Sequence, residues 1–491
     1  MAGGLLLAIV LAPVAAIVII LLVPRPRLAE RLNLAASVIV LGASLPLPWA
    51  SLGGPHVFLD RIVLADPLGA WAVLCAAIVY FLGSLYAVGY MRLLDEEARL
   101  ARFYALFAGF ALAILLAPVM NSVALYWVAI EFTTLVSTFL VAFERAPDSI
   151  EAAWKYIIVV SGGLSLALLG TVLLYWAGSF VLGPRYEITW AVLRAASPHM
   201  NPSLLLLAFL LILVGYGTKV GLAPMHTWLP DAHSEGPAPV SALLSGALLN
   251  VAMIGIVRTL AIVEAGEPGP LPRAALIVLG AFSLFVAALF IVRQRGVKRL
   301  MAYSSVEHMG VMALGFGFGG GLGVAGALYH MLNHSLNKSL MFFGSGSMMR
   351  SFGTKDIGGI RDVGRRFPVI GAVWLAGAVA ITGAPPFGLF ASEFTILRAG
   401  LTGPHAWAVI VMALLLIVIF IAFLNHFRIM YFAPAGNGTA PVRGVSLWCA
   451  TPMWLAFLPV LVLGLWWPSA IWHYFGIVAH GLAAPPMLAL R

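Results

Sequence analysis

Long runs of apolar residues recur along the whole chain, and short segments rich in proline, glycine or charge separate them. A helix needs about 20 such residues to cross the hydrocarbon core of a bilayer. By this length rule the pattern predicts an all-α polytopic membrane protein with about fourteen transmembrane helices. The predicted ranges are 4–23, 32–52, 66–90, 101–119, 122–143, 153–176, 203–229, 236–262, 273–292, 299–318, 322–345, 367–400, 406–431 and 446–467.

Two of the predicted spans, 203–229 and 367–400, are longer than one crossing needs, and each contains prolines. Proline removes a backbone donor and clashes with the preceding helical turn. The first of these spans also carries Lys219, which Pro224 follows closely, so we expect the helix to break beside a charged residue. Transporters build ion sites from broken membrane helices that carry charge.

Charged residues are concentrated in alternate loops. One set of loops holds most of the basic residues, namely Arg25, Arg27, Arg31, Arg92, Arg99, Arg102, Arg293, Arg295, Lys298, Arg299, Arg350, Lys355, Arg361, Arg365 and Arg366. Loops rich in arginine and lysine face the cytoplasm. With an even number of spans, both termini are therefore predicted on the outer side of the inner cell membrane.

Composition supports the membrane class, because 62% of the residues are hydrophobic and only 10% are charged, whereas soluble domains have about 25% charged residues. Cytoplasmic loops explain the net charge of +9, so no nucleic-acid partner is indicated. The two cysteines, Cys75 and Cys449, are too few for a disulfide framework or a thiolate metal site. The sequence has no nucleotide or iron–sulfur motif, which predicts a chain without a cofactor of its own.

Four ionisable residues inside apolar spans indicate an internal repeat. Lys219 follows Glu131 by 88 residues, and Glu393 follows Glu307 by 86 residues. The second member of each pair lies beside a proline-broken helix, and five spans separate equivalent positions, so the two repeats are expected to be inverted. Chance spacing is the alternative. The repeat predicts three N-terminal helices in 1–100, five-helix repeats in 101–262 and 273–431, and a C-terminal helix and tail in 432–491.

Glu131 is the expected partner of Lys219. A charged side chain near the middle of the membrane costs at least about 2.5–3.5 kcal/mol, and an ion pair would offset that cost. A proton that arrives on one member weakens the pair and frees the lysine to donate elsewhere. The alternative is an ion pair that only fixes helix packing.

The segment YHMLNHSLNKSLMFF places His330, His334 and Lys338 on one face of a helix. Histidine takes up and releases protons near neutral pH, so this stripe favours a proton relay. A metal site formed by His330 and His334 is less favoured, because no third ligand follows in the helix and Lys338 would repel a cation. A packed pair of core histidines is a further alternative.

Other polar residues extend this line or flank it. Glu307 and His308 are adjacent and should face different neighbours, since adjacent side chains point apart on a helix. Glu393 is predicted to end the relay. Lys155 either joins the relay or extends to the cytoplasmic surface. For two further groups the sequence leaves two interpretations open. His426 either extends the relay or packs in the core. The loop residues Asp231, His233 and Glu235 either form a proton mouth or are solvated loop charges.

These residues lie in motifs that resemble the antiporter-like subunits shared by respiratory complex I, the multisubunit sodium/proton antiporters and the group 4 nickel–iron hydrogenases. The resemblance covers about residues 65–435 and is strongest to hydrogenase-4 F-type subunits. Its motifs are TKVGLAPMHTWLPDAHSEGPAPVSALLSG, VKRLMAYSSVEHMGVM, the histidine and lysine stripe from His330, and GAPPFGLFASEF.

The resemblance implies fourteen helices, two inverted five-helix repeats and discontinuous helices seven and twelve. It also implies a buried charged axis, with Glu131 and Lys219 as a pair and Glu393 as the terminal site. Related subunits often have a lysine or histidine in the eighth span, where this chain has Asn250 and Ser245. This departure puts full proton pumping by this subunit in doubt.

The function implied is a proton-translocating, or Na⁺-translocating, subunit coupled to electron transfer. The expected partners are other membrane subunits and a peripheral hydrogenase-like or quinone-reducing arm that carries nickel–iron or iron–sulfur centres. The alternatives are an autonomous cation/proton antiporter and a structural membrane scaffold.

Overall fold

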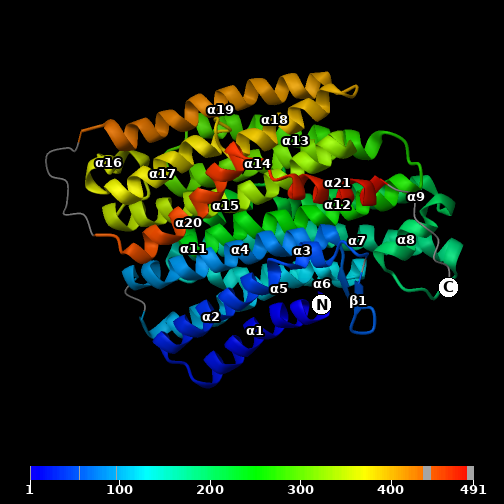
Figure 1. Ribbon diagram of the computed structural model, residues 1–491, viewed down its shortest axis with the longest axis horizontal. Helices are drawn as coiled ribbons and strands as arrows, with labels where there is room; N and C mark the ends of the chain where they lie inside the picture. The colour runs from blue at the N-terminus through cyan, green and yellow to red at the C-terminus, as the bar shows by residue number, and fades with distance from the viewer. Residues whose placement is uncertain (1, 55, 95–96, 435–443, 484–491) are drawn as a thin grey trace.

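The helices lie side by side along the long axis of the molecule (Figure 1). This computed structural model describes residues 2–54, 56–94, 97–434 and 444–483. Within those ranges the only strands are β1 (His56–Phe58) and β2 (Val63–Ala65), which form a small antiparallel hairpin. The predicted all-α fold class is therefore confirmed.

The helices follow the predicted ranges in order. Those of the first half are α1 (Ala2–Leu22), α2 (Pro26–Ser44), α3 (Leu47–Ala50), α4 (Pro67–Tyr90), α5 (Leu100–Leu116), α6 (Val123–Val141), α7 (Pro147–Leu182), α8 (Trp190–Ala196), α9 (Pro202–Val220), α10 (Trp228–Glu235), α11 (Ala238–Leu243) and α12 (Leu249–Ala265). Those of the second half are α13 (Leu271–Val292), α14 (Val297–Phe318), α15 (Gly320–Phe352), α16 (Val363–Arg366), α17 (Pro368–Ile381), α18 (Gly388–Leu401), α19 (Ala406–Phe432), α20 (Leu447–Leu465) and α21 (Ser469–Ala483). Short 3₁₀ turns are η1 (Met91–Leu93), η2 (Glu97–Arg99), η3 (Ala117–Val119), η4 (Ser197–His199) and η6 (Ile357–Gly359), and the π-helix η5 (Leu244–Leu248) joins α11 to α12.

Ten helical segments in the described part of the chain are long and apolar enough to cross a membrane. Each predicted range contains helix. However, α2, α14, α15 and the half-helices α17 and α18 are not among these ten. The polytopic membrane class is confirmed, whereas the exact count of fourteen crossings stays a prediction.

Both predicted helix breaks are present. The first lies between α9 and α10, where Gly221 adopts a left-handed conformation (φ +81°) directly after Val220. The second lies between α17 and α18, where Gly383 has φ +68°. Glycine adopts positive φ without a steric penalty, and the prolines that follow cannot donate the hydrogen bonds that would continue each helix. The predicted discontinuous spans are confirmed.

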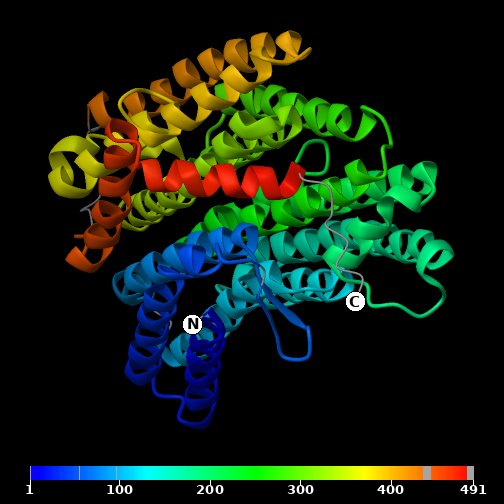
Figure 2. The same ribbon diagram turned by 45° about the vertical axis from the view of Figure 1, so that its right-hand side comes forward.

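The two halves of the chain repeat one packing arrangement. In the first half α7 packs along α6 and α9, and in the second half α15 packs along α14 and α18. The halves meet where α10 packs on α14 and α11 packs on α15. The outermost helices α1 and α19 lie on opposite edges of the bundle in both views (Figures 1 and 2). The exact domain limits remain predictions, and residues 435–443 and 484–491 of the predicted C-terminal part lie outside the described residues.

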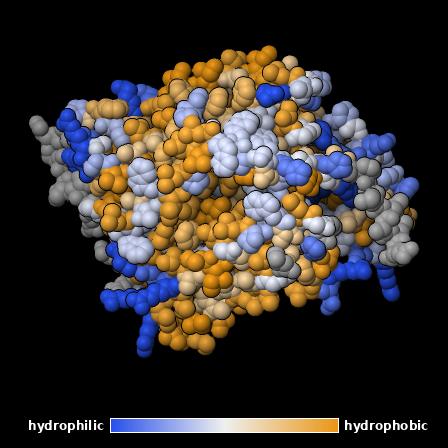
Figure 3. Space-filling view, viewed as in Figure 1, coloured by the Kyte–Doolittle hydropathy of each residue, from blue (hydrophilic) through white to orange (hydrophobic). Residues whose placement is uncertain are grey.

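The surface separates into an apolar middle and two charged ends (Figure 3). Large apolar side chains on the outward face of α7 are exposed, among them Trp154, Ile158, Leu169 and Val172. Exposed apolar residues also follow α19, for example Ile421. Water would penalise such a surface, whereas lipid tails match it. The polar groups described next are buried behind this apolar wall.

Candidate ion-translocation site

Lys219 lies in the last turn of α9, directly before the first helix break, and none of its surface is exposed. Its ammonium group donates hydrogen bonds to Thr134 Oγ1 at 2.7 Å and to the Tyr156 hydroxyl at 2.8 Å. The same nitrogen lies 5.1 Å from the centre of the Tyr156 ring. Two hydroxyl oxygens and one aromatic face therefore solvate the buried charge.

Glu131 does not contact Lys219 directly. Within the part of the chain that the structure describes, no carboxylate oxygen lies within 4.0 Å of the Lys219 ammonium. Glu131 instead accepts a hydrogen bond from Ser161 at 2.7 Å, and its second oxygen is buried without a partner among the described residues. The expected direct ion pair is therefore wrong: Thr134, one helical turn after Glu131 on α6, occupies the place nearest the lysine.

The hydroxyl of Tyr156 has a defined direction. Ser137 donates its only proton to the carbonyl of Thr133 at 2.6 Å. The hydrogen bond of 2.7 Å between Ser137 and Tyr156 must then run from Tyr156 to Ser137. Tyr156 consequently accepts from Lys219 and donates to Ser137, and it connects α9, α7 and α6. Sequence reasoning considered Lys155 and overlooked its neighbour Tyr156, although both lie in an otherwise apolar stretch.

Lys155 lies at the surface and does not reach the buried groups. Its side chain is 52% exposed and forms ion pairs with Glu151 at 2.6 Å and Asp231 at 3.5 Å. Of the two alternatives that the sequence left open, the structure supports extension to the surface. Among the described residues, no hydrogen bond or ion pair links Lys155 to the buried residues of the predicted relay.

Lys338 repeats the arrangement of Lys219 in the second half. Its ammonium donates to the carbonyl of Met301 at 3.1 Å and to Ser304 Oγ. Ser304 lies one turn before Glu307 on α14, as Thr134 lies one turn after Glu131 on α6. Glu307 is fully buried, and its Oε1 atom has no hydrogen-bond partner among the described residues.

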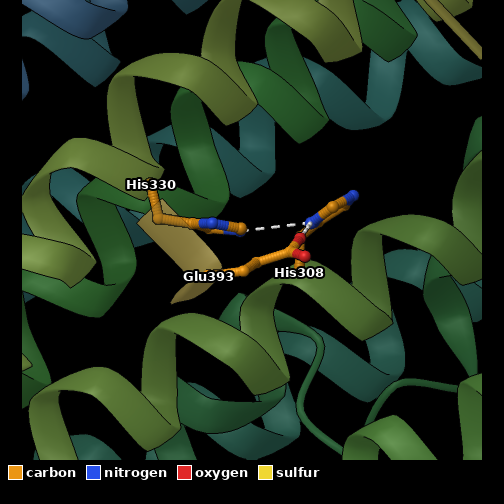
Figure 4. A group of neighbouring side chains, drawn as sticks. All are labelled: His308, His330 and Glu393. Atoms are coloured by element: carbon orange, nitrogen blue, oxygen red, sulfur yellow. Dashed lines mark hydrogen bonds and ion pairs between the residues drawn. The ribbon is translucent and has the colours of Figure 1, made fainter. Parts of the chain in front are cut away.

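His308, His330 and Glu393 converge from α14, α15 and α18 (Figure 4). The His308 Nδ1 atom lies 3.1 Å from His330 Nε2 and 3.9 Å from Glu393 Oε1. The ring of His334 lies 5.5 Å from that of His308, and neither of its nitrogens has a partner within the described chain. The predicted buried stripe is confirmed as a cluster, and His308 joins it from a neighbouring helix.

Hydrogen bonding fixes which nitrogens of this cluster carry protons. Ser392 donates to the carbonyl of Leu389 at 2.8 Å, so its oxygen must accept from His330 Nδ1, which lies 3.0 Å away. His330 Nε2 then holds the lone pair of a neutral ring and accepts from His308 Nδ1. These tautomers are assigned from the hydrogen-bond network. The result is a directed chain from His308 through His330 to Ser392.

Neutral polar groups connect the eighth predicted span to α14 and α15. Ser245 and Ser305 share a hydrogen bond of 2.8 Å, and Asn250 donates to Ser335 Oγ at 2.9 Å. The π-helix η5 contains Ser245 and displaces the register of this segment by one residue. The polar side chains at these positions, Ser245 and Asn250, are non-titratable, and the departure from related subunits stays a prediction.

The remaining polar residues divide between the surface and the interior. His426 makes a hydrogen bond of 2.7 Å with the carbonyl of Ile291, in agreement with a packing role. Asp231 pairs with Arg299 at 2.5 Å, and Glu235 pairs with Lys355 at 2.7 Å. His233, between these two acids, is buried instead.

A cavity of about 710 Å³ opens at the arginine-rich end of the bundle beside Ser234, and Glu144, Lys298 and Arg350 line it. Lys298 donates to the carbonyls of Ser234, at 3.3 Å, and Gly236. The buried ring of His233, next to Ser234, stacks on Phe342 with ring centres 4.9 Å apart. Polar groups thus extend inward from this end of the molecule.

Residues 120–420 match the family described as NADH:quinone oxidoreductase/Mrp antiporter, transmembrane. The chain belongs to this family. This antiporter-family chain is 36% identical to the hydrogenase-4 component F homolog of Methylacidiphilum infernorum (isolate V4) over 422 residues, which cover 84% of the chain and 87% of that relative. Hydrogenase-4 component B of Escherichia coli (strain K12) is 31% identical over 359 residues, which cover 70% of the chain but 52% of that protein.

Solved structures share the fold of the antiporter-family chain over almost its whole length. A chain of the membrane-bound sulfane sulfur reductase, an archaeal respiratory membrane complex, superposes with a TM-score of 0.86 at 21% identity and covers 98% of this chain and 97% of its own. A chain of the Mrp complex from Dietzia sp. DQ12-45-1b gives 0.86 at 19% identity, with 99% and 98% covered. The predicted membership of the antiporter-like subunits is confirmed.

Proposed function

We propose that this chain moves protons across the inner cell membrane as one membrane subunit of a larger redox complex, and that it has no redox centre of its own. The single observation that carries the proposal is Lys219. It is a fully buried amine at a helix break, and within the described chain two hydroxyls and an aromatic ring hold it. Ionisable residues inside membrane spans are costly, and function is the usual reason for keeping them.

The groups around the two buried lysines favour protons over Na⁺. Hard cations bind to several oxygen ligands at once. Here Lys219 and Lys338 themselves occupy the nearby hydroxyls as hydrogen-bond donors, so a metal cation would compete with a bound positive charge. A proton needs only one lone pair at a time, which a neutral amine provides.

Glu131 acts on Lys219 through the electric field of its carboxylate and not through a direct contact. While the carboxylate is ionised, it favours the charged form of the lysine. A proton that arrives on Glu131 removes this stabilisation, and the lysine then releases its proton along the polar contacts of the interior. Lys338 beside Ser304 repeats this element, and Glu393 lies at the far end. Asn250 and the serines between the halves would carry protons only with the help of ordered water.

The expected partner subunits are inferred from the relatives and not from this chain alone. The relatives named above include hydrogenase-4 components. By analogy, we expect neighbouring membrane subunits and a peripheral hydrogenase-like or quinone-reducing arm with nickel–iron or iron–sulfur centres. The arginine-rich end would face the cytoplasm and both termini the outside.

The test replaces Lys219 in the assembled complex and measures proton uptake into membrane vesicles alongside redox turnover. Lys219→Gln should reduce the number of protons moved per electron pair to zero. Lys219→Arg should lower this number, because arginine does not release its proton. Lys155→Gln is the matched control and should pump as the wild type does.

Pumping that persists in Lys219→Gln overturns the proposal. A purified chain that exchanges cations by itself would instead identify an autonomous antiporter. Loss of complex assembly in every buried-charge variant, with no separate loss of pumping, would identify a scaffold.

A further inference from the structure

Three ligand-type side chains from three helices meet inside the second half of the chain. One ligand atom from each of His308, His330 and Glu393 lies within 4.8 Å of the other two. All three residues are buried. We propose that they form a binding site for a zinc-class divalent cation, and that the bound cation arrests transport.

The spacing of the ligand atoms fits a small tetrahedral ion. Zinc bonds to nitrogen and oxygen are about 2.0–2.2 Å long, which places tetrahedral ligands about 3.3–3.6 Å apart. The two imidazole nitrogens are 3.1 Å apart, and His308 Nδ1 is 3.9 Å from Glu393 Oε1. A shift of the Glu393 carboxylate by about one ångström would complete the geometry.

The buried polar atoms around this point have unused bonding capacity. Glu393 Oε1, His308 Nε2 and both nitrogens of His334 have no hydrogen-bond partner among the described residues. Ser392 already holds His330 by its Nδ1 proton, which leaves the Nε2 lone pair for a ligand. An outer partner of this kind is what orients metal-binding histidines. For His308 to bind through Nδ1, its proton moves to the unpartnered Nε2. His334, whose ring centre lies 5.5 Å from that of His308, is a further imidazole close to these ligands.

The charges nearby admit a cation. The sequence argument against a metal relied on the missing third ligand and on repulsion by Lys338. The structure supplies His308 and Glu393 from other helices, and it fixes the Lys338 ammonium on Ser304 and Met301. The buried carboxyl groups of Glu307 and Glu393 lie in the same region, and a bound cation would hold Glu393 in its ionised form, because metal ligands must be deprotonated.

The ligand chemistry selects the class of ion. Two imidazoles with one carboxylate suit zinc and related transition metals, whereas Mg²⁺ and Ca²⁺ require sets of oxygen ligands. A bound ion would take the lone pairs of both imidazoles and tie α18 to α14 and α15. Binding does not depend on the proposed function, whereas the arrest of transport does.

Binding is tested on the full-length chain in detergent, with ZnCl₂ followed by removal of free metal, and with Co²⁺ as a spectroscopic probe. We expect one retained zinc per chain and the visible absorption bands of tetrahedral Co²⁺. His308→Asn, His330→Asn and Glu393→Gln should each lower the retained zinc at least tenfold. His405→Asn, at the start of α19 and outside the cluster, is the control and should retain it.

Anomalous scattering at the zinc edge locates the ion in the wild-type chain, so the test does not depend on the folding of any variant. A zinc peak between His308, His330 and Glu393 supports the inference. Zinc retention that is unchanged in all three variants, or a peak elsewhere, overturns it. Zinc that binds at this site without slowing proton transport would leave the site intact and refute the arrest.

Discussion

Tyr156→Phe removes the hydroxyl that connects the buried Lys219 to α7. The ring and its packing on Trp228, with centres 4.8 Å apart, remain. What is lost is the acceptor 2.8 Å from the Lys219 ammonium and the donor to Ser137. Ser137 keeps its bond to the Thr133 carbonyl, so the substitution leaves no new unsatisfied donor on α6.

The size of the effect follows from the type of bond. A hydrogen bond to a charged group contributes about 1.5–3 kcal/mol. Lys219 has two such bonds to side chains, and Tyr156→Phe leaves only the bond to Thr134. The equilibrium ratio of protonated to neutral Lys219 should then fall about 10- to 150-fold, since each 1.4 kcal/mol is a factor of ten.

The assay is proton uptake per electron pair in vesicles that contain the assembled complex. We expect Tyr156→Phe to lower this ratio by at least tenfold at an unchanged amount of assembled complex. Tyr431→Phe is a matched control, because it also deletes a buried tyrosine hydroxyl. The Tyr431 hydroxyl donates to the Gly371 carbonyl at 2.6 Å and lies far along the chain from Lys219. Wild-type pumping in Tyr156→Phe would refute the idea that the Tyr156 hydroxyl stabilises the protonated form of Lys219.

Two further predictions address packing and the histidine cluster. A β-carbon on Gly215 of α9 would lie 2.5 Å from the backbone nitrogen of Ala167 on α7, so Gly215→Val should destabilise the chain by about 1–3 kcal/mol. Thermal unfolding in detergent checks this against Gly162→Val, whose β-carbon would meet open space, and equal melting temperatures would contradict the close packing. Ser392→Ala removes the acceptor that fixes the His330 tautomer. It should slow proton uptake with assembly intact, Ser392→Thr should restore it, and an unaltered rate in Ser392→Ala would rule the tautomer argument out.

Several features of the chain follow from local sequence. Hydropathy depends on a stretch of about 20 residues, so the apolar helices and their order could be predicted. The breaks after Val220 and Ile381 could be predicted as well, because glycine and proline limit the backbone wherever they stand. The burial of the ionisable residues inside those runs follows for the same reason. The structure buries most members of this set, namely Lys219, Glu307, His330, His334, Lys338 and Glu393, whereas Glu131 is only half-buried.

Contacts between helices were not predictable in the same way. Spacing along the chain paired Glu131 with Lys219, but the lysine contacts Thr134 and Tyr156. The sequence also left open whether Lys155 joins the relay or extends to the surface, and in the structure it lies at the surface. Which of two neighbouring residues faces inward depends on the rotation of each helix, and close packing of small residues such as Gly215 against Ala167 sets that rotation.

The sequence by itself therefore determined that this is a polytopic helical protein with two broken spans and a set of buried charges. Only the tertiary structure decided which atoms those charges meet, including the meeting of His308 with His330 and Glu393. The physical reason is the range of the interactions. Burial in lipid acts on each segment separately, whereas a hydrogen bond of about 3 Å needs two helices to be placed to within a fraction of that distance.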